Sequence, residues 1–87
     1  MDDEVGRSGR LLLGSVKAGR LLAVLMRSPL NYQIVRQNGS HRTLRSTSGY
    51  PDLVFAFHEG VTLPPRMVKK ILVGRVGLTE DQARELL

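Results

Sequence analysis

The spacing of apolar residues in the first third of the chain predicts an amphipathic helix. These residues lie three, one and three positions apart: Ala18, Leu21, Leu22 and Leu25. Such spacing places them on one stripe of a helix, and the neighbouring basic residues fall largely outside it. Ser15 is a good N-cap before the stripe. Ser28-Pro29 ends the helix, because proline lacks an amide donor and restricts the preceding residue.

Three extended segments are predicted next, separated by turn-forming residues. The first, at 32–37, has β-branched residues at its centre, and a return strand is expected at 40–45. A polar loop at 46–51 then leads to a largely apolar run at 53–57. We interpret that run as a third, well-buried strand.

Asn38-Gly39 is the strongest short hairpin signal in the chain, because a type I′ turn needs positive φ at both central residues. With a two-residue turn there, Gln37 would face Ser40 and Arg36 would face His41. Alternation would then put four residues on one face of the sheet: Arg36, His41, Thr43 and Arg45. A four-residue turn would change this pairing, and the sequence leaves the register open.

The last third of the chain predicts two helices. Pro64-Pro65 suits a first helical turn, where a missing N–H costs little. The residues behind it divide into a buried stripe, Val68, Ile71 and Leu72, and a basic face, Arg66, Lys69, Lys70 and Arg75. Gly77 is a natural C′ residue. Thr79 to Gln82 form a predicted capping box with Leu78 and Ala83 as its hydrophobic staple, and Leu86 and Leu87 should return to the core.

The predicted order is therefore α-β-β-β-α with a short extra C-terminal helix. This is an α+β fold in which a three-stranded antiparallel sheet packs on two helices. Eighty-seven residues fit one domain, which we place at residues 15–87. Residues 1–14 are expected to be a mobile tail whose leucines could dock on the domain.

Composition indicates the cellular compartment and excludes several kinds of functional site. The chain has no cysteine, which excludes disulfides, thiolate zinc sites and thiol nucleophiles and fits a reducing cytoplasm. The longest apolar run, residues 21–26, is far short of a membrane span, and the acidic start of the chain has the wrong charge for a secretory signal. We expect a soluble, cytoplasmic protein with no membrane partner.

Basic residues dominate the central part of the chain. The whole protein carries a net charge of +5, but residues 15–78 hold ten bases and only two acids, Asp52 and Glu59, for a net charge of +8. A compact body with that excess attracts phosphate backbones over about a Debye length. A polyanion partner is favoured over a surface that is basic only for solubility.

Several segments together resemble the HicA family of mRNA-cleaving toxins. The segments are Val35-Arg36-Gln37-Asn38-Gly39-Ser40-His41-Arg42, Phe57-His58-Glu59-Gly60, Leu63-Pro64-Pro65, Val68-Lys69-Lys70-Ile71-Leu72 and Val76-Gly77-Leu78-Thr79. The resemblance implies a fold related to the double-stranded-RNA-binding domain and ribosome-independent cleavage of RNA. It also implies a required histidine in the Gly39-Ser40-His41 motif, and a HicB antitoxin that covers this site.

Independently of this resemblance, the residues favour acid–base catalysis by histidine. Metal-assisted phosphodiester cleavage needs several carboxylates on one face, whereas the central segment offers only two, so we expect no metal and no cofactor. RNA carries its own nucleophile, the 2′-hydroxyl, and His is the side chain that titrates near neutral pH. His41 is thus the candidate general acid or base, and His58 is a second candidate or a partner-contacting residue.

Basic residues around the motif are candidate RNA ligands. They are Arg36, Arg42, Arg45, Lys69 and Lys70. Two other functions stay open at this point: an RNA-binding module without catalysis, and a protein-interaction domain whose basic face docks on an acidic partner. Gly39 is explained by turn geometry whatever the function.

Overall fold

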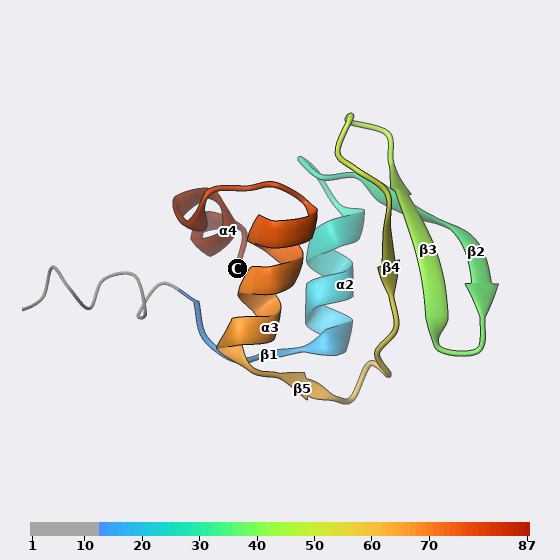
Figure 1. Cartoon of the computed structure of the whole chain (residues 1–87), viewed down its shortest axis with the longest axis horizontal. Helices are drawn as coiled ribbons and strands as arrows, with labels where there is room; N and C mark the ends of the chain where they lie inside the picture. The colour runs from blue at the N-terminus through green and yellow to red at the C-terminus, as the bar shows by residue number, and fades with distance from the viewer. Residues whose placement is uncertain (1–12) are drawn as a thin grey trace, which may run out of the picture.

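Apolar stripes on two helices and one face of a sheet meet in a single core. The computed structural model describes residues 13–87. The elements are β1 (Val16–Lys17), α2 (Ala18–Met26), β2 (Tyr32–Asn38), β3 (His41–Ser46), β4 (Leu53–Phe55), β5 (Thr62–Leu63), α3 (Pro65–Lys69), η1 (Lys70–Arg75) and α4 (Glu80–Leu86). Figure 1 shows α2 and α3 side by side, with the sheet on one side of them. The expected α+β class with a three-stranded antiparallel sheet is confirmed.

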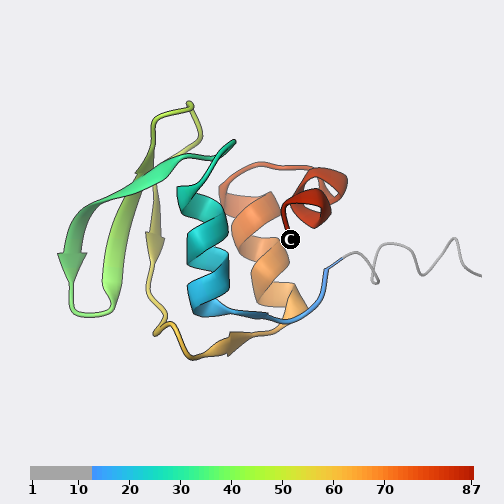
Figure 2. The same cartoon turned by 180° about the vertical axis from the view of Figure 1, so that it is seen from behind.

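The sheet has the order β2-β3-β4, so that β3 is central and both neighbours run antiparallel to it. One face carries Leu44, Leu53 and Phe55, all of them buried. β2 lies farthest from the helices in Figures 1 and 2. Only the first of its residues, Tyr32, is buried, and the other six are exposed. The β2–β3 hairpin therefore extends beyond the core.

The predicted helical stripes are confirmed as core. Ala18, Leu21, Leu22 and Leu25 of α2 are buried, and so are the three residues predicted from the second helix: Val68, Ile71 and Leu72. Each fully buried leucine contributes about 1.5–3 kcal/mol relative to exposure. Leu13, from the expected tail, also packs into this core, whereas residues 1–12 of that tail lie outside the described residues.

Tyr32 is the largest buried side chain of the sheet, with 1% of its surface exposed. Its hydroxyl donates a hydrogen bond to the Pro51 carbonyl over 2.6 Å. Burial raises the pKa of the Tyr32 hydroxyl, and the negative charges of Asp52 and Tyr50 raise it further. Tyr32 thus links the start of β2 to the loop before β4.

The first helix does not begin at a serine cap, so the Ser15 prediction is wrong. Val16–Lys17 pair instead with Thr62–Leu63, as strands β1 and β5. The first amides of α2 then find backbone acceptors: Ala18 N–H donates to Val61 O over 2.7 Å, and Gly19 N–H to Glu59 O over 2.9 Å. Tertiary backbone contacts satisfy the helix terminus in place of a side chain.

The third strand is shorter and less buried than the sequence predicts. β4 covers only Leu53–Phe55, because the chain turns away from the sheet after Phe55. Val54 is 53% exposed, since it points to the face of the sheet that no helix covers. The run of apolar residues has one buried face and one open face, as an antiparallel edge strand does.

The proline-started helix, its stop at Gly77 and the capping box are confirmed. Pro65 is the first residue of α3, and the helix continues as the π-helical segment η1, which ends before Gly77 at φ +95°. In the capping box, Gln82 N–H donates to Thr79 Oγ1 over 3.1 Å, and Thr79 N–H donates to Gln82 Oε1 over 2.9 Å. Leu86 and Leu87 pack against the core.

Candidate nucleic-acid interface

The hairpin that carries His41 turns one residue later than predicted. Asn38 pairs with His41, so the two turn residues are Gly39 and Ser40. The expected pairing of Gln37 with Ser40 is therefore wrong: Gln37 pairs with Arg42. Gly39 has φ +63°, and a hairpin turn with Gly at its first central position meets that requirement without steric cost.

A β-bulge at Val35 decides which face each β2 side chain takes. Ile34 pairs with Leu44, and Arg36 pairs with Thr43, so Val35 is the extra residue between them. Without it, Arg36 would face Arg42 on the side of the sheet that packs on the helices. The bulge instead places Arg36 on the open side, while the start of β2 keeps its buried register.

One open surface results, which we call the outer face. It consists of alternate residues of β2 and β3 that point away from the helices: Arg36, Asn38, His41, Thr43 and Arg45. His41 is exposed, stands at the tip of the hairpin and lies opposite Asn38. Arg36 therefore shares the face of His41, as the sequence predicts, although it lies two residue pairs farther along the ladder, opposite Thr43.

Arg45 lies on the outer face but has an acidic neighbour. Its Nε is 3.4 Å from Asp52 Oδ2, and the two side chains are 65% and 53% exposed. A pair this exposed is worth little, because water and salt screen it. A phosphate could replace Asp52 as the partner of Arg45 at small cost.

Arg42 points to the opposite side of the sheet from His41. Its side chain is only 13% exposed, and its Nη2 lies 3.3 Å from Glu59 Oε2. Nη1 of Arg42 is buried without a hydrogen-bond partner among the described atoms. Arg42 therefore binds the segment that follows β4, and the structure does not bring it together with His41.

His58 lies in that same segment and is exposed. Its carbonyl accepts a hydrogen bond from Val61 N–H over 3.1 Å. Since β4 ends opposite the beginning of β3, His58 leaves the sheet at the end where His41 enters it. Glu59, which the sequence analysis did not assign to the site, ties this segment to Arg42 and so fixes its place.

Lys69 and Lys70 belong to a different surface. They lie on α3 and η1, which pack on the side of the sheet opposite the outer face. Lys69 forms an ion pair with Glu80 at the start of α4. Lys70 lines a groove beside β4 instead. The basic residues predicted as one RNA site are thus divided between two sides of the molecule.

Residues 13–87 contain no group of three His, Cys, Asp or Glu side chains placed to hold a metal ion. None of the helices in this part of the chain is long and apolar enough to cross a membrane. In comparisons with known proteins, no family model, curated protein or solved structure matches the chain.

Proposed function

We propose that this protein is an endoribonuclease of the HicA toxin type, in which His41 transfers protons during cleavage of mRNA. One observation carries the proposal. The exposed imidazole of His41 stands at a hairpin tip on a face shared with Arg36 and Arg45. The order of helix α2, the three-stranded sheet β2-β3-β4 and helix α3, with only the short strand β5 between β4 and α3, supports a fold like the double-stranded-RNA-binding domain.

In the proposed reaction, His41 accepts the proton of a ribose 2′-hydroxyl. The 2′-oxygen then attacks the adjacent phosphorus, the bond from phosphorus to the 5′-oxygen breaks, and the leaving oxygen takes a proton from solvent water, to which His41 returns the one it accepted. The products are a 2′,3′-cyclic phosphate and a 5′-hydroxyl. General acid–base help of this kind contributes about 10²- to 10⁴-fold in rate. No metal or cofactor takes part.

Arg36 supplies the positive charge that the reaction needs. It is exposed and has no acidic partner among residues 13–87. A guanidinium offers a planar fork of donors that matches a phosphate and keeps its charge at any working pH. Arg36 would hold the phosphate next to His41 and stabilise the charge that develops on its oxygens.

The resemblance adds a partner to the proposal. A HicB-type antitoxin would cover the outer face and block access of RNA to His41. Such a toxin acts on mRNA in the cytoplasm. The antitoxin is expected to bind wild-type protein and His41→Ala about equally well, because most interface residues contribute little when truncated and the dominant ones are enriched in Trp, Tyr and Arg.

The test compares the two histidines on one RNA substrate. Cleavage of a labelled RNA in excess chelator should fall about 10²- to 10⁴-fold in His41→Ala. His58→Ala is the matched control, because it removes the only other imidazole and should retain most of the activity.

An unchanged rate in His41→Ala would overturn the catalytic assignment. Binding of RNA by the wild-type protein without any cleavage would identify a non-catalytic RNA-binding module. Binding of an acidic protein with no RNA binding at low salt would identify an interaction domain.

A further inference from the structure

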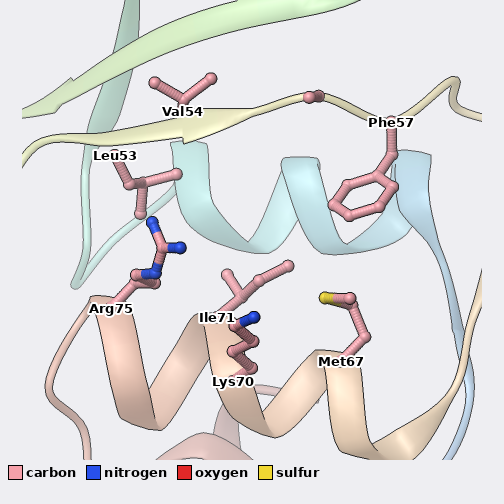
Figure 3. Close-up of a pocket in the computed structure, with 8 residues that line it drawn as sticks. Leu53, Val54, Phe57, Met67, Lys70, Ile71 and Arg75 are labelled. Carbon is pink, nitrogen blue, oxygen red and sulfur yellow. The ribbon is translucent and has the colours of Figure 1, made fainter.

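A groove lies at the open edge of the sheet, away from the outer face. It separates β4 from the α3–η1 helix and has a volume of about 200 Å³. Figure 3 shows its two walls, with Leu53 and Phe57 on the β4 side and Met67 and Ile71 on the helix side. We call it the β4 groove. Its volume is below the roughly 300–1,000 Å³ of small-molecule sites, so it suits a few side chains better than a cofactor.

The backbone beside the β4 groove has room for another strand. β4 pairs with β3 on one side, and within residues 13–87 no strand pairs with its other side. An unpaired edge offers N–H and C=O groups to any extended chain that comes alongside. Alternate side chains of such a chain would enter the groove, and the others would lie beside Val54, which is 53% exposed.

The charges on the helix wall select the kind of chain that fits. Lys70 and Arg75 line the groove, both are exposed, and neither forms an ion pair with an acidic residue of the described chain. Met67 and Ile71 place apolar surface next to these cations. The wall therefore complements a strand whose groove-facing side chains, every second residue, include both apolar and acidic ones.

From these three features we propose that the β4 groove binds an extended acidic peptide of a partner protein, which adds a strand to β4. This mode of recognition takes affinity from backbone hydrogen bonds and specificity from alternate side-chain pockets. RNA would meet Lys70 and Arg75 but would leave the apolar floor and the strand edge uncovered. A second copy of this chain, with a net charge of +5, would be repelled by the same cations.

The experiment uses NMR to follow titration of the isotopically labelled full chain with a blocked octapeptide in which every second residue is threonine and the positions between are valine and glutamate in turn, so that both face the groove. Amide shifts should change at residues 53–57 and 67–75, and amides at the free edge of β4 should exchange more slowly with solvent. The control peptide has the same sequence with lysine in place of each glutamate. At the same concentration it should leave the chemical shifts of these amides unchanged, because its lysines are repelled by Lys70 and Arg75.

Substitutions in the helix supply a matched pair. Lys70→Gln combined with Arg75→Gln should weaken binding of the valine–glutamate peptide about tenfold at low salt. Arg66→Gln removes an exposed charge from the same helix outside the groove and should change it less than twofold. Unchanged shifts elsewhere in each variant verify that the protein is folded.

Four results would overturn the proposal. The first is an absence of shifts along β4 on addition of the valine–glutamate peptide. The second is equal binding of the lysine peptide, and the third is displacement of the acidic peptide from the groove by a short single-stranded RNA. The fourth is broadening of β4 amides with protein concentration alone, which would assign the edge to a second copy.

Discussion

Single side chains in this protein have different roles according to the face of the sheet they occupy. His41 and Arg42 are adjacent in sequence, yet His41 is exposed on the outer face while Arg42 is largely buried against Glu59. Alternation along β3 produces this separation. A substitution at position 42 should therefore act on stability first, and a substitution at position 41 on activity.

Ionisation of Tyr32 should lower the free energy of unfolding at alkaline pH. Burial raises the pKa of its hydroxyl in the folded state, so its contribution to stability is complete below about pH 10, the ordinary tyrosine value. That contribution is lost as pH rises through the folded pKa, because the unfolded chain releases the proton first. Tyr32→Phe should cost about 1 kcal/mol at pH 7 through loss of the bond to Pro51.

Urea unfolding at pH 7 and above pH 10 tests this prediction. The free energy of unfolding should fall less between the two pH values in Tyr32→Phe than in the wild type. Tyr50→Phe, at the half-buried tyrosine, is the control: it removes only the last of the three causes of the raised Tyr32 pKa and should keep most of the wild-type fall. An equal fall in Tyr32→Phe and wild type would contradict the assignment.

At the scale of elements, the close approach of α2 to the turn after β4 favours a glycine at position 19. A Cβ at Gly19 would lie 3.1 Å from Glu59 Cβ and 3.4 Å from Glu59 O, whereas a Cβ at Gly74 in η1 would have no neighbour within 4 Å. Gly74→Ala should stabilise the protein by about 0.5–1 kcal/mol, because alanine loses less conformational entropy in a helix.

Gly19→Ala should lower the free energy of unfolding in place of raising it. Glu59 cannot easily move away from the new Cβ, because it is held by both Gly19 N–H and Arg42. The midpoints of urea unfolding for the two variants measure the difference. Equal stabilisation by both alanines would show that the turn moves freely away from α2.

Elements with a strong local signal were predictable from sequence, and those set by distant contacts were not. The capping box at Thr79 and the stop at Gly77 depend on residues a few positions apart, and both are confirmed. The start of α2 depends on carbonyls some forty residues away, which no local pattern reveals. The same holds for β5, which is a strand only because β1 pairs with it.

The candidate site was predictable in its residues more than in its geometry. Asn38-Gly39 identified the hairpin, yet the turn begins at Gly39, because the bulge at Val35 adds a residue to β2. Arg42 looked equivalent to Arg36 in sequence. Only its buried position next to Glu59 distinguishes it.

For the whole molecule, the division of basic residues between two sides predicts how RNA binding responds to salt. Each phosphate contact with single-stranded nucleic acid adds about 0.7 to the slope of log K against log salt. Arg36→Gln on the outer face should lower that slope by about 0.7. Arg66→Gln, on the helix side, should leave it unchanged. Both arginine substitutions are made in the His41→Ala protein, so that filter binding from 50 to 200 mM salt measures RNA binding without cleavage. Equal slopes for the two arginine variants would show that RNA does not bind at Arg36.

Product analysis tests the central claim most directly. If His41 activates the ribose 2′-hydroxyl, wild-type protein in excess chelator will leave 2′,3′-cyclic phosphate ends and 5′-hydroxyl ends on RNA. A substrate with a single 2′-deoxy nucleotide at the cleavage site will stay intact there. Cleavage at the deoxy position, or products with 5′-phosphate ends, would contradict the account, because neither arises when the neighbouring 2′-oxygen is the nucleophile.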